Sequence, residues 1–162
     1  MIELSELYKK QSQLDMTIAS KRGIGVEETL EERCLAFLVE LGELANETRC
    51  FKYWSSKGMS PKERILDEYA DGLHFLLSIG NIIKTSFLRG EGQESYRTLT
   101  DAFVATYNSF TIFVANPFDK LYIRAFQEFL TLGKMLSLSE EEIEEAYLKK
   151  LKINYERQEN GY

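Results

Sequence analysis

Apolar side chains recur along most of this 162-residue chain at the three- and four-residue spacing of amphipathic α-helices. Glycine and proline interrupt the periodic stretches, most clearly at residues 21–25 and 55–63. No stretch shows a convincing strand alternation, and the best candidate, residues 110–115, continues the helical spacing that starts at Phe103. The pattern therefore predicts an all-α bundle of five to six helices, forming a single domain over residues 1–162.

Capping signals place several of the expected helix boundaries. Ser60 and Ser139 each stand three residues before a glutamate, the sequence pattern of a capping box, so we expect each serine to open a helix. Pro61 strengthens the first signal, because proline is common in the first helical turn. The expected helices cover, approximately, residues 2–20, 26–54, 60–87, 96–114, 118–136 and 139–158.

The second and third of these helices each carry two acidic residues three positions apart, Glu40 with Glu43 and Glu68 with Asp71. Side chains with this spacing share one face of a helix. On the second helix, Glu43 and Glu47 point within about 60° of Glu40, and apolar residues flank this acidic stripe on both sides. An ordinary surface helix has a wide polar arc instead. The pairs are therefore either solvated glutamates that make helical ion pairs or the ligands of something positive.

Convergence of the two pairs would require a cation, because four ionised carboxylates in one cleft repel each other strongly. Ligand sets made only of oxygen favour Mg²⁺, with Mn²⁺ as a substitute. The Glu-x-x-His pairs of di-iron bundles are absent, and His74 is the only histidine. Mg²⁺ held by carboxylates keeps coordination positions that phosphates commonly fill. Because the pair occurs twice, in two apolar helices, we favour the cation site over the solvated stripe.

Composition narrows the function classes. The net charge of −6 argues against broad electrostatic binding to nucleic acid or to an anionic membrane surface. No apolar run approaches the roughly 18 residues of a membrane span, and the N-terminal stretch lacks the pattern of a signal peptide. Cys34 and Cys50 are too few for a disulfide scaffold and lack the paired spacing of a zinc site. We therefore expect a soluble, cytoplasmic protein with no membrane or nucleic-acid partner.

Residues beside the acidic pairs are compatible with a slot for a nucleotide. Phe75 continues the stripe of Glu68 and Asp71, so its ring could support a base while a cation holds the phosphates. An aromatic residue at this spacing also packs well in a core. Lys52 and Trp54 close the second helix, and the C-terminal "AYLKKLKINYERQENGY" is locally basic, which would suit either phosphate binding or ordinary helix ends.

Two longer stretches carry a family resemblance. "LVELGELANETRCFKYWS" and "LDEYADGLHFLLSIG" resemble the dimeric, all-α dUTPase family, especially its phage and Gram-positive branch. That family is grouped with the MazG-type nucleotide pyrophosphohydrolases through a shared E-x-x-E…E-x-x-D motif. Two further stretches, "QSQLD" at residues 11–15 and "NYERQENGY" at residues 154–162, are also similar to family motifs, so the resemblance covers nearly the whole chain.

The resemblance implies an enzyme that hydrolyses dUTP, and also dUDP, to dUMP, releasing pyrophosphate from dUTP by attack of water at the β-phosphorus. It further implies an obligate type of homodimer. Glu40, Glu43, Glu68 and Asp71 would ligate Mg²⁺. Glu43, or alternatively Glu40, would also orient or deprotonate the attacking water.

The resemblance also assigns roles in substrate binding. The uracil edge would face Gln11 and Asp15, and the base would lie on Phe75. The deoxyribose would meet His74 and Trp54, with Lys52 at the edge of the substrate. The phosphates would be held, in a closed form, by Lys150, Asn154, Arg157 and Tyr162.

Two departures from the family pattern bear on the substrate. Leu151 follows Lys150 where many members have asparagine, which removes one polar phosphate contact. Asp15 stands where many members have asparagine, and an ionised carboxylate accepts hydrogen bonds without donating any. Beside the dUTPase interpretation, two alternatives stay open: a pyrophosphohydrolase for dCTP or a modified nucleotide, and a helical protein that binds a protein partner without catalysis.

Overall fold

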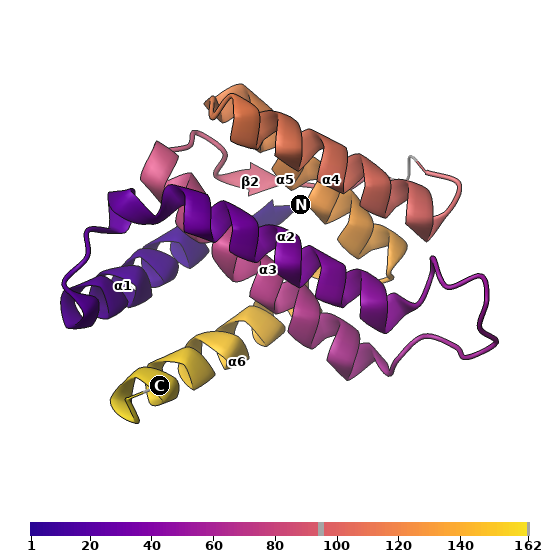
Figure 1. Cartoon of the computed structure of the whole chain (residues 1–162), viewed down its shortest axis with the longest axis horizontal. Helices are drawn as coiled ribbons and strands as arrows, with labels where there is room; N and C mark the ends of the chain where they lie inside the picture. The colour runs from indigo at the N-terminus through magenta and orange to yellow at the C-terminus, as the bar shows by residue number, and fades with distance from the viewer. Residues whose placement is uncertain (94–95, 162) are drawn as a thin grey trace.

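The computed structural model describes residues 1–93 and 96–161, and this part of the chain forms six α-helices, one short 3₁₀ helix and two very short strands (Figure 1). The prediction of an all-α bundle is confirmed. The elements, in chain order, are β1 Ile2–Glu3, α1 Ser5–Arg22, η1 Val26–Thr29, α2 Leu30–Thr48, α3 Lys62–Ile83, β2 Arg89–Gly90, α4 Leu99–Ala115, α5 Asp119–Met135 and α6 Glu140–Glu159.

Helix α3 lies at the centre of the bundle and packs against α1, α2, α5 and α6. Helix α2 runs antiparallel beside it, and α4 and α5 form a second pair (Figure 1). Burial of α3 follows from a sequence that is apolar over most of the helix circumference, so that Tyr69, Leu73 and Leu76 are fully buried. Gly80 permits the close approach of α1 and α5, because a Cβ there would collide with Tyr8 and Tyr122.

Aromatic rings fill the space between the two helix pairs. The ring centroid of Phe37 lies 4.4 Å from that of Phe110 and 5.5 Å from that of Phe129. The buried Tyr69 hydroxyl donates a hydrogen bond of 2.9 Å to the backbone oxygen of Phe129. Since buried polar groups are stable only when they are paired, this bond completes the packing of α3 against α5. The core thus fixes the helices that carry the acidic pairs.

Several predicted helix boundaries differ from the structure. Helix α2 ends at Thr48, earlier than predicted, because Arg49 adopts a left-handed conformation with φ of 59°. Helix α3 ends at Ile83, also earlier than predicted, and Lys84 follows with φ of 57°. Helix α4 begins later than predicted, at Leu99. Left-handed residues other than glycine are uncommon, so the apolar periodicity gave no sign of these two ends.

The two predicted capping boxes have different outcomes. The box at Ser139 is confirmed: its hydroxyl accepts from the backbone N–H of Glu142, and the Glu142 carboxylate accepts from the backbone N–H of Ser139. The box at Ser60 is wrong, because the Ser60 hydroxyl donates to Glu47 on α2 and Pro61 occupies the N-cap position. A tertiary contact has replaced the local one.

The two short strands were not predicted. They pair antiparallel, with Ile2 opposite Gly90 and Glu3 opposite Arg89. A strand of two residues is too short to show alternation, so the sequence pattern extended the first helix to residue 2 instead. Within the described ranges, no helix is both long and apolar enough to cross a membrane.

Candidate active site

The two acidic pairs converge where α2 and α3 run side by side. Glu40, Glu68 and Asp71 each offer a carboxylate oxygen, and these three oxygens lie within 4.8 Å of one another. Their three-residue spacing on α3, and the antiparallel course of α2, turn all three toward the same groove. We call these three residues the acidic end. The prediction that the pairs meet is confirmed for these three residues.

Burial and mutual repulsion disfavour the ionised forms of the carboxyl groups at the acidic end. Burial first, and then the charges of Asp71, Glu43 and Glu68, raise the pKa of Glu40 to about 8. Burial and the same kind of repulsion raise the pKa of Glu68 to about 7. One carboxylate oxygen of each, Oε2, is buried without a hydrogen-bond partner among the described residues. Such oxygens are costly unless something positive pairs with them, so a hard divalent cation fits this donor set.

Glu43 and Glu47 extend the acidic stripe of α2 in different ways. Glu43 is exposed, and its side chain makes hydrogen bonds with Glu40 and Glu68 that help to raise their pKa values. Glu47 turns away from the cluster: it accepts from the Ser60 hydroxyl and forms a 2.8 Å ion pair with Arg64. The two glutamates therefore have different surroundings: Glu43 lies beside the acidic end, whereas Glu47 contacts Ser60 and Arg64.

A buried lysine contacts the acidic end. The Nζ atom of Lys150, on α6, lies 3.0 Å from an oxygen of Asp71 and 3.1 Å from an oxygen of Asp67. Burial opposes the positive charge of Lys150, but these two carboxylates outweigh it and raise its pKa. The ammonium group is therefore held, charged, beside the acidic end.

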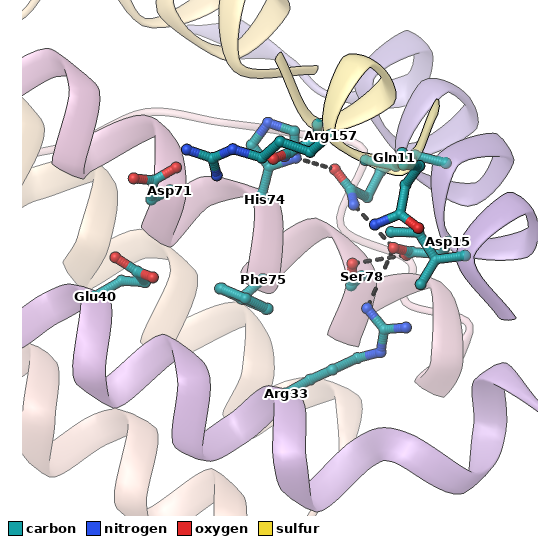
Figure 2. Close-up of a pocket in the computed structure, with 13 residues that line it drawn as sticks. Gln11, Asp15, Arg33, Glu40, Asp71, His74, Phe75, Ser78 and Arg157 are labelled. Carbon is teal, nitrogen blue, oxygen red and sulfur yellow. Dashed lines mark hydrogen bonds and ion pairs between the residues drawn. The ribbon is translucent and has the colours of Figure 1, made fainter. Parts of the chain in front are cut away.

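A cavity of about 250 Å³ extends from the acidic end between α1, α2, α3 and α6 (Figure 2). Figure 2 shows Glu40 and Asp71 at one side, Asp15 and Arg33 at the other, and the ring of Phe75 between them. Most of the residues predicted from the sequence are thus brought together. The lining residues are Gln11, Leu14, Asp15, Ile18, Arg33, Glu40, Asp71, His74, Phe75, Ser78, Asn154, Arg157 and Gln158.

The far side of the cavity is a closed hydrogen-bond network, which we call the amide end and define as Gln11, Asp15, Arg33 and Ser78. One oxygen of Asp15 accepts from Gln11 Nε2 at 3.0 Å and from Arg33 Nη1 at 3.2 Å, and the other accepts from the Ser78 hydroxyl at 2.6 Å. Burial raises the pKa of Asp15, whereas these three donors favour its ionised form.

His74 and Tyr147 hold the amide of Gln11 from the opposite side. Gln11 Oε1 lies 2.5 Å from His74 Nδ1 and accepts from the Tyr147 hydroxyl at 3.0 Å. The two aromatic rings stack with centroids 4.4 Å apart. Burial lowers the pKa of His74 to about 4, so the ring is neutral near pH 7, and its tautomer with the proton on Nδ1 is the one that donates to Gln11 Oε1. His74 Nε2 is buried without a partner among the described residues.

Three predicted site residues lie elsewhere or outside the described chain. Trp54 is 64% exposed and packs against Phe51 and Tyr53 in the loop after α2. Lys52 lies over the Phe51 ring at 5.7 Å from its centroid. Neither residue lines the cavity. Tyr162 falls outside the described residues.

Sequence reasoning missed Arg33 and Ser78 as site residues. Each lies seven positions, close to two helical turns, from a residue of the acidic end: Arg33 before Glu40 on α2, and Ser78 after Asp71 on α3. The same helical spacing that identified Phe75 could therefore have identified both. Their partner Asp15 lies on a third helix, which the periodicity alone did not place.

Comparison with known proteins agrees with the earlier resemblance. The sequence matches a protein-family model described as dUTPase, and the match spans residues 3–162. It therefore includes both acidic pairs and every residue that lines the cavity. No curated protein matches the sequence.

Proposed function

We propose that the cavity between the acidic end and the amide end is the active site of this chain, which belongs to the dUTPase family and hydrolyses dUTP to dUMP. The observation that carries the assignment is the convergence of Glu40, Glu68 and Asp71 on one side of a cavity whose other side is lined by directed hydrogen-bonding groups. A nucleotide has the same division, with anionic phosphates at one end and a polar base edge at the other.

The acidic end suits a divalent cation, and we assign Mg²⁺, with Mn²⁺ as a substitute. Glu40, Glu68 and Asp71 would hold the ion, with Glu43 beside them. Among the described residues, the buried Oε2 atoms of Glu40 and Glu68 have no hydrogen-bond partner, which supports this fit. When bound, Mg²⁺ neutralises phosphate charge and lowers the pKa of a bound water.

Residues around the acidic end have complementary tasks in hydrolysis. Exposed Glu43 is the carboxylate best placed to orient the attacking water and accept its proton, because it contacts the cluster without being buried in it. Lys150 supplies positive charge for the phosphates from beside Asp71. Asn154 and Arg157, which line the same cavity from α6, extend this contact surface.

The middle of the cavity would hold the nucleoside. Phe75 lies between the two ends and is partly exposed, so one side of its ring is available to the base (Figure 2). His74 is neutral and buried at the wall, where it would restrict the space beside the sugar. Gln11 and Asp15 would meet the edge of the uracil.

A nucleotide panel tests this function. Pure protein is incubated with Mg²⁺ and, separately, dUTP, dUDP, dCTP, dTTP and UTP, and release of pyrophosphate or phosphate is measured. We expect the highest kcat/KM for dUTP, with dUDP also hydrolysed. Preference for dCTP would favour the alternative pyrophosphohydrolase, and no turnover of any nucleotide would favour the partner-binding alternative.

We also propose that the chain acts as a homodimer. Apolar side chains on α2 and α4 remain exposed, including Leu35 at 64% and Val39 at 50%. On α4, Val104 and Ile112 are similarly exposed. Neighbouring exposed apolar residues are typical of an interface. Light scattering after size exclusion should give twice the chain mass of 18.8 kDa, and a monomer mass would contradict the proposal.

A further inference from the structure

Arg33 is the one strongly charged donor of the amide end. Its side chain is 15% exposed. Its Nε donates to Thr29 Oγ1 at 2.8 Å, and its Nη1 donates to Asp15 Oδ1 at 3.2 Å. A guanidinium has more N–H groups than these two contacts use, and Arg33 lines the cavity, so it can also donate to a ligand.

The orientation of Gln11 is fixed by its neighbours. Its Nε2 faces the carboxylate of Asp15, which only accepts, so its Oε1 is the atom that faces the two donors, the Tyr147 hydroxyl and the Nδ1–H tautomer of His74. Reversal of the amide would set an N–H group against those donors and an oxygen against a carboxylate. Gln11 therefore presents an N–H donor beside Asp15.

Asp15 Oδ1 thus lies between two donors, Gln11 Nε2 on one side and Arg33 Nη1 on the other. Figure 2 shows the three groups together at one side of the cavity. Across the amide end, the order of hydrogen-bonding groups is therefore a donor (Gln11), an acceptor (Asp15) and a second donor (Arg33). Uracil offers the complementary sequence along one edge: the O4 acceptor, the N3–H donor and the O2 acceptor.

We propose that Arg33 is a specificity residue for the pyrimidine base, whose guanidinium donates to one carbonyl oxygen of uracil while Asp15 accepts from N3–H and Gln11 donates to the other carbonyl. This inference rests on the proposed function, because it assumes that the cavity binds dUTP. It also explains how Asp15 can stand where many family members have asparagine: the donor that a carboxylate lacks comes from Arg33.

The same arrangement rejects cytosine. Cytosine carries an amino donor at position 4 and an acceptor at N3, so it would set a donor against a donor and an acceptor against Asp15. Sites that lose buried hydrogen bonds with the wrong ligand discriminate strongly against it. A purely structural Arg33, which only ties α1 to α2 through Asp15, would instead affect both bases equally.

The experiment measures kcat/KM for dUTP and dCTP with the parent protein, Arg33→Met and Arg33→Lys. Methionine keeps the apolar stem but has no donor, whereas lysine keeps a charged donor. For Arg33→Met we expect the dUTP:dCTP ratio to fall about tenfold or more, mainly through a higher KM for dUTP, which is the range for a hydrogen bond to a charged group. Arg33→Lys should recover part of the ratio.

Arg64→Met is the matched control, because Arg64 forms an ion pair with Glu47 on α2 and does not line the cavity. Its dUTP:dCTP ratio should equal that of the parent. A ratio within about twofold of the parent for a folded Arg33→Met would overturn the inference and leave the proposed function intact. A parent protein that does not hydrolyse dUTP would overturn both.

A second measurement covers the case in which Arg33→Met does not fold. In the ¹⁵N-labelled parent protein, the guanidinium N–H signals of Arg33 should shift on addition of dUMP and shift much less with dCMP. A shift of the Gln11 side-chain amide with dUMP, without any change at Arg33, would contradict the inference.

Discussion

The two ends of the cavity differ in how their charges are compensated. At the amide end, each Asp15 oxygen has a hydrogen-bond donor and Gln11 is held from both sides. At the acidic end, Glu40 and Glu68 each keep a buried oxygen without a partner among the described residues. The amide end is preorganised by the protein alone, whereas the carboxylates of the acidic end repel one another until a proton or a cation is added.

This difference indicates how the site divides its work. Preorganised groups select a ligand because they would lose hydrogen bonds with the wrong one. Groups that repel one another provide a strong field for a cation, and through it for phosphates. We therefore expect changes at the acidic end to affect turnover, and changes at the amide end to affect selectivity and KM.

The largest expected effect is at the acidic end. Glu43→Gln should lower kcat for dUTP by about 10²- to 10⁴-fold with the fold retained, because glutamine cannot accept the proton of the attacking water. Glu47→Gln is the matched control from the same stripe, and its kcat should stay close to that of the parent because Glu47 contacts Ser60 and Arg64 instead. Equal losses of kcat in the two variants would contradict the separate roles assigned to Glu43 and Glu47.

Cation binding should depend on pH in the range where the acidic end titrates. The pKa values of about 8 for Glu40 and about 7 for Glu68 mean that protons compete with the cation below these values. We expect Mn²⁺ affinity, measured by calorimetry, to rise about tenfold or more between about pH 6.5 and pH 8.5. Glu40→Gln should flatten this dependence, and a parent affinity independent of pH would contradict the prediction.

At the amide end, Tyr147→Phe should have a moderate effect. It removes the hydroxyl that donates to Gln11 Oε1 at 3.0 Å, so this oxygen keeps only His74, while Gln11 Nε2 still donates to Asp15. The loss of one neutral hydrogen bond predicts a rise of about fivefold in KM for dUTP with little change in kcat. Tyr53→Phe, which changes an exposed hydroxyl, serves as the control. A fall in kcat as large as that of Glu43→Gln would erase the distinction between the ends.

The smallest expected effect is on stability. Because the folded-state pKa of Glu40 is raised, the folded protein binds more protons than the unfolded chain between about pH 4.5 and pH 8, and stability is lost as pH rises through this window. In the absence of divalent cations, Glu40→Gln should therefore have a Tm higher than the parent by about 2–4 °C near pH 8.5, with little difference near pH 4.5.

Glu47→Gln should change stability in the opposite direction. Hydrogen bonds from Ser60 and Arg64 lower the pKa of Glu47, so its ionised form stabilises the fold above the ordinary glutamate range and that stability is lost at lower pH. Thermal scans should therefore show a small decrease in Tm for this variant near neutral pH. The same sign for both variants would contradict the assignment of two different environments.

The sequence was sufficient for the features that depend on one helix at a time. Helical spacing predicted the bundle, and repetition of the acidic pair predicted that Glu40, Glu68 and Asp71 meet. Helical spacing could not predict the features that depend on how several helices pack together. The contact from Ser60 to Glu47 displaced a predicted capping box, and Arg33 gains its place only because α1 brings Asp15 beside it.

The family resemblance supplied what periodicity could not. Gln11, Asp15 and Asn154 were placed at the site through motif likeness, and the structure brings all three to one cavity. Lys52 and Trp54 were first predicted from their place at the end of the expected second helix, yet they lie away from the cavity in the loop after α2. The difference follows from the early end of α2, because Arg49 redirects the chain before these residues can continue the helical face.

The central claim is that one cavity holds a cation at its acidic end and uracil at its amide end. Crystals grown with Mn²⁺ and the non-hydrolysable analogue α,β-imido-dUTP test it directly through anomalous scattering. We predict an anomalous peak within about 2.0–2.6 Å of carboxylate oxygens of Glu40, Glu68 and Asp71, with the uracil edge against Gln11 and Asp15. An anomalous peak elsewhere, or a base bound away from the amide end, would contradict the account.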